Sequence, residues 1–257
     1  MTNALIGYTG FVGTNLLFQT QFEDLFRSTN IREIRGKSYH TLVCSGAPAA
    51  KWIANKNPED DSRNIAHLIC SLQEVSAEHV VLISTVDVYS NPTAVDESSP
   101  IDIANAEPYG KHRYELEQFV CGHFDSVLIV RLPGLFGIGL RKNAIYDLIH
   151  DNALDLIHSE ARYQFYDLAN LWKDIQRAQR EGLSLLNITT EPVSIGELAQ
   201  ECFSRSFYNR PHDNPASYDI RSCHDMQLGG KGGYLYTKEE VLSSLKSFVA
   251  QQLRESV

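Results

Sequence analysis

Tyr109 and Arg113 are the two residues whose types and spacing best suit acid–base chemistry. They lie four positions apart after Pro108, and a proline that opens a helical pattern is typical of a helix start. Residues four apart share one face of a helix. A phenol with a pKa of about 10 is a poor base at neutral pH unless a nearby cation favours its anion. We therefore expect Arg113 to lower the pKa of Tyr109 and to make it an acid/base group.

Thr85 is the candidate for holding the oxygen atom with which Tyr109 exchanges a proton. It follows the apolar run Val80–Ser84, which has the composition of a buried strand. In an open α/β sheet, the carboxyl ends of the strands line the ligand crevice. We therefore expect the hydroxyl of Thr85 to face that crevice and to position a substrate oxygen.

Three glycines near the start of the chain form a candidate phosphate site. Gly7, Gly10 and Gly13 stand between the apolar run Ala4–Ile6 and an apolar helical pattern. In this context the first glycine permits a sharp turn, the second lets the backbone approach a pyrophosphate, and the third lets helix pack on strand. The N–H groups of the first helical turn then face the phosphates. We expect a dinucleotide to bind through Gly7, Thr9, Gly10, Phe11, Val12 and Gly13.

The residues after the second expected strand bear on which dinucleotide binds. A carboxylate roughly 20 positions beyond the glycine turn would hold the free ribose hydroxyls of NAD. The chain offers Arg27 and Ser28 there, a cation and a hydroxyl suited to a 2′-phosphate, whereas Glu23 and Asp24 precede the expected strand end. We therefore expect NADP rather than NAD, the alternative being that Arg27 is only a solvated surface cation.

The composition disfavours several classes of protein. A net charge of −9 argues against non-specific nucleic-acid binding, which needs basic surface. The 257 residues contain neither a secretory signal pattern nor an apolar run of about 18 residues, so we expect a cytoplasmic protein without a membrane partner. The five cysteines are scattered, and no His-Glu-x-x-His or Cys-x-x-Cys pattern occurs. We expect reduced thiols and no metal site.

Apolar runs alternate with helical patterns in the first half of the chain. Strands are expected at Ala4–Ile6, Asp24–Arg27, Thr41–Cys44, Val80–Ser84 and Val127–Arg131, and helices at Phe11–Gln19, Pro58–Val75 and Pro108–Cys121. Such alternation predicts an α/β fold, a Rossmann doubly wound parallel sheet buried on both faces. We assign residues 1–137 to this nucleotide-binding core and residues 138–257 to a smaller, partly interleaved substrate lobe, with a strand near 185–188 rejoining the core.

The second half has fewer expected elements. Helical patterns run over Asn143–His150, Ala169–Arg180, Ile195–Phe203 and Thr237–Leu253. Ser194 is the expected cap of the third of these, and Thr237 with Glu240 forms a capping box for the last.

These motifs together resemble the extended short-chain dehydrogenases/reductases, within them the NAD-dependent epimerase/dehydratase family. The resemblance rests on the glycine turn, Ser84-Thr85-x-x-Val88-Tyr89, Pro108-Tyr109-Gly110-Lys111, Asn64-Ile65, Arg131–Gly137 and Leu186-Asn187-Ile188. It implies hydride transfer between a nicotinamide and a sugar nucleotide or similar carbonyl/alcohol substrate, with Tyr109 as acid/base and with Tyr109 and Arg113 also in contact with the cofactor. Whether the reaction is reduction, epimerisation or dehydration stays open.

The chain departs from the family at two places. The family motif is Tyr-x-x-x-Lys, and Arg113 stands at the position of the lysine, which binds the nicotinamide ribose and lowers the tyrosine pKa. Arginine keeps the charge but is larger and planar, and Lys111 points elsewhere on the helix. The stretch between the second strand and Thr41 is also short, so one strand–helix unit of the family is expected to be missing.

Substrate binding is the least determined part of the prediction. Arg141, Lys142 and Arg221 are candidate cations for a pyrophosphate, because arginine grips phosphate with two donors, although each is as easily a surface charge. Two alternatives to a sugar-nucleotide enzyme stay open. One is a non-catalytic NADP-binding sensor or interaction protein of the same fold, and the other is a reductase with a small apolar substrate. The resemblance also implies a homodimer, with the exposed face of the helix at Pro108–Cys121 as the candidate surface.

Overall fold

The computed structural model describes residues 2–255, and the chain forms two compact units. The first unit comprises the residues up to Asn91 with Glu97–Leu132 and Ala169–Asn187. The second comprises Pro92–Asp96, Pro133–Leu168 and the residues from Ile188 onward. Each unit therefore contains segments from distant parts of the chain.

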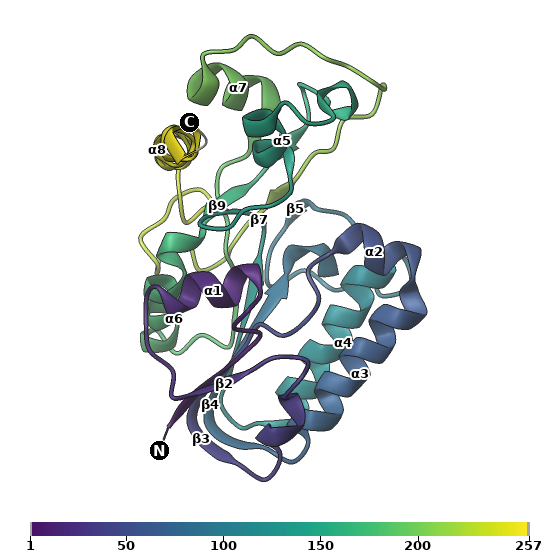
Figure 1. Ribbon diagram of the computed structural model, residues 1–257, viewed down its shortest axis with the longest axis vertical. Coiled ribbons are helices and arrows are strands. Elements are labelled where there is room, and N and C mark those ends of the chain that lie inside the picture. The colour runs from purple at the N-terminus through teal and green to yellow at the C-terminus, as the bar shows by residue number, and fades with distance from the viewer. Residues whose placement is uncertain (1, 256–257) are drawn as a thin grey trace. The chain divides into compact units, whose positions relative to one another are not determined.

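The first unit is built on one parallel six-stranded sheet (Figure 1). Its strands in spatial order are β10 (Leu185–Asn187), β6 (Val127–Leu132), β4 (Ser76–Thr85), β3 (Ser38–Cys44), β1 (Asn3–Ile6) and β2 (Asp24–Phe26). All five neighbouring pairs run parallel. The expected α/β class with a doubly wound parallel sheet is confirmed, and the late strand does join this sheet beside β6.

Helices cover both faces of the sheet, as its near-continuous apolar strands require. On one side lie α1 (Phe11–Leu17) and α6 (Leu171–Arg180), where the backbone N–H of Trp172 donates to the side chain of Gln19 at 2.9 Å. The other group comprises α2 (Lys51–Lys56), α3 (Pro58–Leu72) and α4 (Pro108–His123), with α3 packed beside α4 (Figure 1). Buried residues of α3 and α4 share a core with the sheet, among them Ile65, Leu68, Leu116 and Val120.

The connection from β2 to β3 is shortened, as expected from the sequence. Only a 3₁₀ turn, Ile31–Ile34, separates them, and β2 is the last strand on its side of the sheet. Because β2 and β3 flank β1 on opposite sides, the strand order reverses at β1. In open α/β sheets, ligands bind in the crevice at such a reversal, at the carboxyl ends of the strands.

The second unit consists of small sheets and three α-helices. Its strands are β5 (Thr93–Val95), β7 (Gly134–Phe136), β8 (Arg162–Tyr163), β9 (Phe165–Asp167), β11 (Val193–Ser194) and β12 (Asp219–Ile220), paired as β7–β9, β8–β11 and β5–β12. The helices are α5 (Ala144–His150), α7 (Ile195–Phe203) and α8 (Lys238–Glu255). Throughout residues 2–255, no helix combines the length and apolarity needed to cross a membrane.

Most predicted elements are present with shifted ends. The capping box at Ser194 and Glu197 is formed, and Thr237 and Glu240 exchange the two hydrogen bonds of a second one. Helix α3 ends three residues before the predicted Val75, and α4 continues two residues past the predicted Cys121. Helix α2 and the short strands of the second unit were not predicted. A six-residue helix and strands of two or three residues are all too short to show a detectable period.

Candidate functional site

The glycine turn has the geometry expected of a phosphate site. Gly7 has φ of +86°, and a Cβ on it would lie 2.3 Å from the carbonyl oxygen of Ser45. A Cβ on Gly13 would lie 2.2 Å from the carbonyl oxygen of Gly7. Gly10 precedes α1, and no side chain caps that helix. The first-turn N–H groups are thereby left for an anion, and the exposed Thr9 stands beside them.

Arg27 and Ser28 follow β2 directly and are both exposed. The Nε of Arg27 donates to Thr29 at 2.9 Å. The nearest carboxylate, Asp24, lies inside β2 and accepts hydrogen bonds from Lys37 and Tyr39, which hold its pKa below the usual value. The residues after β2 thus offer a cation and a hydroxyl, while Asp24, the first residue of the strand, is already hydrogen-bonded to Lys37 and Tyr39.

Tyr109 is the second residue of α4 and lies beside Thr85 at the carboxyl end of β4. Its backbone N–H donates to Asn55 at 2.9 Å, and its side chain shares a hydrogen bond with Thr85. The adjacent position 110 has room only for glycine, because a Cβ there would lie 1.9 Å from the carbonyl oxygen of Asp87. The structure therefore brings together the two residues that the sequence predicts to share a substrate oxygen.

The pKa of Tyr109 is raised above the ordinary value. Burial of the phenol is the largest cause, and the carboxylate of Asp87 adds to it. The positive charges of Arg113 and Lys51, together with the hydrogen bond to Thr85, act in the opposite direction. Arg113 therefore has the effect on the pKa that its position predicts, but burial outweighs it, and Tyr109 is protonated at neutral pH.

Arg113 is held in a buried ion pair that the sequence did not indicate. One of its terminal nitrogens donates to Asp61 at 2.8 Å, and the other donates to the second oxygen of the same carboxylate. It also donates to the carbonyl oxygens of Pro48 and Tyr109. His112 shares the carboxylate through its Nδ1, at 2.7 Å. Burial alone would raise the pKa of Asp61, but the hydrogen bonds from Arg113 and His112 hold it below its usual value.

Lys51 is the second cation beside Tyr109. Its ammonium group donates to Asp87 at 2.7 Å, and the backbone N–H of Asp87 donates to the hydroxyl of Thr85 at 3.1 Å. The side chain of Lys51 is 41% exposed, whereas that of Arg113 is 3% exposed. In the sequence, Lys51 and Trp52 follow Ala47 and Pro48, and the six residues of α2 are too few to show a helical period.

A buried polar network connects the carboxyl-terminal parts of β4, β6 and β10. Arg131 pairs with Glu117 through two nitrogens, at 3.0 and 2.6 Å, and donates to the hydroxyl of Tyr89 at 2.8 Å. Ser84 donates to the same Glu117, and the side-chain amide of Asn187 donates to Tyr89 at 3.0 Å. Ser84 of β4, Arg131 of β6 and Asn187 of β10 thus belong to one hydrogen-bonded network, and Ser84 directly precedes Thr85 in the chain.

The three candidate substrate cations belong to the second unit. Arg141 and Lys142 are exposed between β7 and α5, and partial burial lowers the pKa of Lys142. Arg221 follows β12, pairs with Asp219 at 3.2 Å and lies 5.5 Å from the ring centroid of Tyr234.

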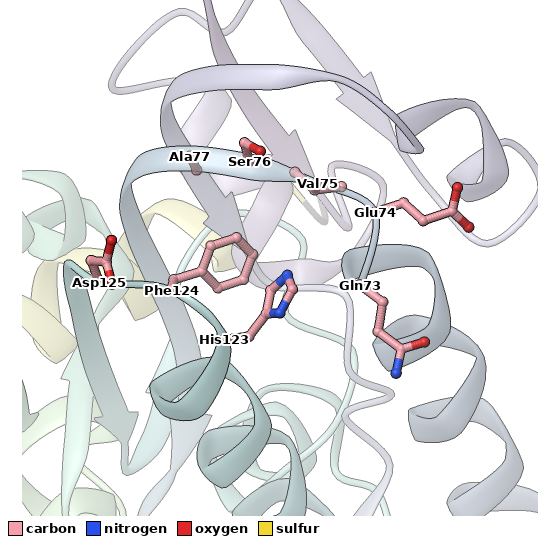
Figure 2. A pocket seen from close by; sticks show the side chains of 8 residues that line it. All are labelled: Gln73, Glu74, Val75, Ser76, Ala77, His123, Phe124 and Asp125. Atoms are coloured by element: carbon pink, nitrogen blue, oxygen red, sulfur yellow. The ribbon is translucent and has the colours of Figure 1, made fainter.

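A cavity of about 400 Å³ lies near the amino end of β4, at the opposite end of that strand from Thr85 (Figure 2). It is lined by residues 73–77, where α3 leads into β4, and by His123, Phe124 and Asp125 at the end of α4. It contains none of the predicted site residues. The amino end of β4 lines it, whereas Thr85 stands at the carboxyl end.

Solved structures of other proteins have a fold similar to that of this chain. No protein-family model matches the chain, and none of the curated proteins does. Among solved structures, MoeE5 in complex with UDP-glucuronic acid and NAD has a TM-score of 0.74 at 16% identity, over 100% of both chains. UDP-N-acetylglucosamine 4-epimerase from Methanobrevibacter ruminantium has a TM-score of 0.73 at 14% identity, over 99% of this chain and 98% of that one.

A third neighbour is dTDP-4-dehydrorhamnose reductase from Bacillus anthracis in complex with NADP. It has a TM-score of 0.73 at 19% identity, over 98% of this chain and 99% of the other. The chain has the fold of these proteins. This is the fold implied by the resemblance to the extended short-chain dehydrogenases/reductases, and that expectation is confirmed over the whole chain.

Proposed function

We propose that the chain is an NAD(P)-dependent oxidoreductase of the epimerase, dehydratase or reductase kind that acts on a sugar nucleotide or a related carbonyl/alcohol substrate. The placement of Thr85 at the carboxyl end of β4 and of Tyr109 in the first turn of α4, which packs against Asp87 just beyond β4, carries this proposal. The glycine turn supports a pyrophosphate site, because α1 begins at this turn and no side chain caps its first-turn N–H groups. The bound nicotinamide would supply or accept the hydride.

Tyr109 acts as the proton donor in this proposal. Its raised pKa keeps the phenol protonated at neutral pH, so that it can give its proton to a carbonyl oxygen as that carbon is reduced. The hydroxyl of Thr85 holds the same oxygen. Arg113 and Lys51 stabilise the phenolate that remains, because both positive charges favour the anionic form. The reverse proton transfer serves oxidation.

Lys51 takes over part of the role of the missing lysine. The guanidinium of Arg113 is committed to Asp61 and to two backbone carbonyls, so it supplies charge without being able to swing toward a ligand. The ammonium of Lys51 lies on a flexible, half-exposed side chain beside the same phenol. We assign to Lys51 the contact with the hydroxyl or phosphate oxygens of the cofactor.

Arg27 and Ser28 favour NADP over NAD in this proposal. Both follow β2 and are exposed, where a 2′-phosphate would meet them, and Asp24 is occupied by Lys37 and Tyr39. In the second unit, which we propose as the substrate lobe, Arg141, Lys142 and Arg221 are the candidates for a nucleoside diphosphate. Association of two copies through the exposed face of α4 stays a prediction.

A non-catalytic NADP-binding protein is the second candidate function. The observation that favours it is the buried pair of Arg113 and Asp61, because it uses for structure the position that a catalytic lysine would occupy. Such a protein would keep the glycine turn and respond to the bound dinucleotide without turnover.

Titration with NADPH and, separately, NADH tests the proposal first, with nicotinamide fluorescence as the signal. The proposal requires binding, and the roles of Arg27 and Ser28 require tighter binding of NADPH. Preference for NADH would overturn only those two roles. If a dinucleotide binds, redox change of the bound cofactor with sugar nucleotides separates the enzyme from the non-catalytic protein. Binding of neither dinucleotide would overturn both candidate functions.

A further inference from the structure

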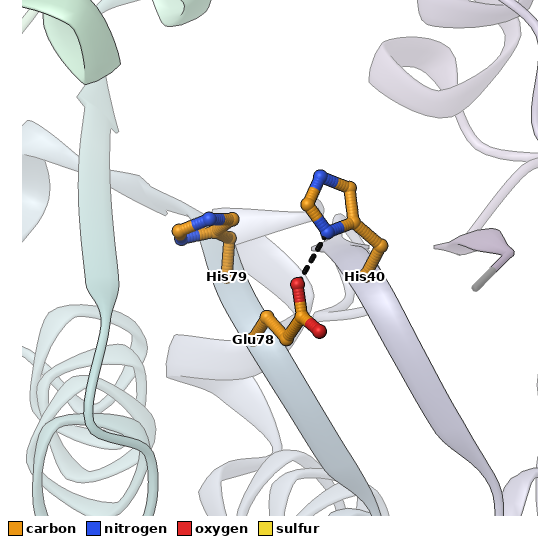
Figure 3. A group of neighbouring side chains, drawn as sticks. All are labelled: His40, Glu78 and His79. Atoms are coloured by element: carbon orange, nitrogen blue, oxygen red, sulfur yellow. Dashed lines mark hydrogen bonds and ion pairs between the residues drawn. The ribbon is translucent and has the colours of Figure 1, made fainter.

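His40, Glu78 and His79 form a group at the amino ends of β3 and β4, here called the histidine cluster (Figure 3). All three residues are exposed. One ligand atom from each lies within 4.8 Å of those from the other two. Strands β3 and β4 pair in parallel with Thr41 opposite His79, so the sheet register brings His40 to a pair of residues far along the sequence.

The histidine cluster is separate from the site around Tyr109. Glu78 precedes Thr85 by seven residues within β4, which corresponds to roughly 23 Å of strand. The cluster therefore stands at the amino edge of the sheet, whereas the glycine turn and Thr85 stand at the carboxyl edge.

The side chains of the cluster have the chemistry of a transition-metal site. Two imidazoles and one carboxylate are a donor set that suits Zn²⁺. The Nδ1 of His79 lies 3.0 Å from the hydroxyl of Ser126, which orients the ring and leaves Nε2 for a ligand bond. Such a hydrogen bond to the second nitrogen is the usual support of a metal-binding histidine. The Nδ1 of His40 lies 2.6 Å from a carboxylate oxygen of Glu78.

We propose that the histidine cluster binds one Zn²⁺ through a nitrogen of His40, a nitrogen of His79 and a carboxylate oxygen of Glu78. Zinc bonds of about 2.0–2.2 Å in tetrahedral geometry place neighbouring ligand atoms about 3.4 Å apart. The ligand atoms lie within 4.8 Å of one another on exposed side chains, so binding requires them to move closer together. The metal replaces the contact between His40 and Glu78, and water completes its coordination.

Zinc at this place links the starts of two neighbouring strands. The unfolded chain does not hold the three ligands together, so binding stabilises the folded protein. The sequence predicts no metal site because that prediction considers local patterns such as His-Glu-x-x-His. The histidine cluster contains no such pattern. Only Glu78 and His79 are adjacent in sequence, and the third ligand comes from another strand.

The test is a titration of chelator-treated protein with Zn²⁺ in competition with a chromophoric chelator. The variants are His40→Ala, His79→Ala and Glu78→Gln, with His67→Ala as the matched control, since His67 is exposed on α3 outside the cluster. We expect one equivalent bound equally by the wild type and His67→Ala, and at least about ten-fold more weakly by each cluster variant. Ser126→Ala should lose about ten-fold through the freed ring of His79.

Two further measurements complete the test, because Cys70, Cys121 and Cys223 are exposed and thiolates also bind zinc. Co²⁺ in the site should show weak visible bands without thiolate charge transfer. Zn²⁺ should raise the Tm of the wild type and of His67→Ala, and leave that of His40→Ala unchanged. Equal zinc affinity in wild type and cluster variants, or a thiolate spectrum with Co²⁺, would overturn the proposal.

Discussion

The guanidinium carbon of Arg113 lies 3.9 Å from the ring centroid of Tyr109, and the carboxylate of Asp61 holds it in that place. A planar guanidinium can stack on an aromatic ring and donate two hydrogen bonds to a carboxylate at the same time. The positive charge of Arg113 thus lies against the ring of Tyr109, while its two terminal nitrogens donate to Asp61 and to backbone carbonyls. In the proposed enzyme, Arg113 therefore supplies charge to Tyr109, and Lys51 is the cation proposed to contact the cofactor.

Replacement of Asp61 by alanine should destabilise the protein strongly. The change leaves the buried charge of Arg113 without its partner, which costs about 3–5 kcal/mol in comparable buried pairs. Urea unfolding of Asp61→Ala measures the loss. The control is Asp60→Ala, because Asp60 is exposed on the same helix and pairs with the exposed Arg63, so its loss should stay below about 1 kcal/mol. Similar losses in both variants would show that the buried pair has no special weight.

The contribution of Asp61 to stability should also depend on pH. Its pKa is lowered in the folded protein by the hydrogen bonds from Arg113 and His112, although burial opposes them. The stabilisation is therefore complete above the ordinary carboxyl pKa and is lost as the pH falls through the lower, folded value. We expect the difference in free energy of unfolding between the wild type and Asp61→Asn to shrink below about pH 4. A constant difference in acid would contradict the assignment.

Tyr109→Phe should separate binding from catalysis. The change removes only the phenolic oxygen, so dinucleotide affinity should stay unchanged while turnover falls by about 10²–10⁴-fold, the range for loss of a general acid. Nicotinamide fluorescence gives the first quantity, and a coupled redox assay on a sugar nucleotide identified by screening gives the second. Tyr114→Phe, on the same helix, is the matched control. Full activity of Tyr109→Phe would exclude Tyr109 as the acid/base.

Lys51→Met should raise the pKa of Tyr109 further, because it removes one of the two positive charges that lower it. The pKa can be followed without any substrate, by ¹⁹F NMR of a fluorotyrosine incorporated at position 109, whose lower intrinsic pKa brings the titration to a lower pH. Lys51→Arg should restore most of the effect. Lys56→Met, on the same short helix, should leave the pKa unchanged. An unshifted pKa in Lys51→Met would exclude this role whether or not the protein is an enzyme.

Features of the fold that depend on local sequence could be predicted well. The strand–turn–helix at Gly7–Gly13 and the caps at Ser194 and Thr237 are encoded by neighbouring residues, and each is found in the structure. The short strands of the second unit have two or three residues each, and their pairing partners lie far away in the sequence. No local pattern can indicate them.

The site could be predicted in part for the same reason. Thr85 and Tyr109 each follow a clear local signal, a strand end and a helix start, and the sheet brings them together. Asp61 gave no such signal, because an acidic residue in the first turn of a helix is ordinarily solvated and favourable for the helix dipole. Its burial under Arg113 depends on α3 and α4 packing against each other, which only the fold determines.

Two glycines of α4 should respond in opposite ways to replacement by alanine. A Cβ at position 110 would lie 1.9 Å from the carbonyl oxygen of Asp87, so Gly110→Ala must push the first turn of α4 away from the end of β4. A Cβ at Gly122 would meet nothing within 4 Å, and alanine there should stabilise the helix by up to about 1 kcal/mol. Urea unfolding should therefore show a loss for Gly110→Ala and a gain for Gly122→Ala. Because the displaced turn contains Tyr109, Gly110→Ala should also raise the pKa of a fluorotyrosine at position 109 or broaden its titration. An unchanged titration with unchanged stability would mean that the close approach of Gly110 to Asp87 does not position Tyr109.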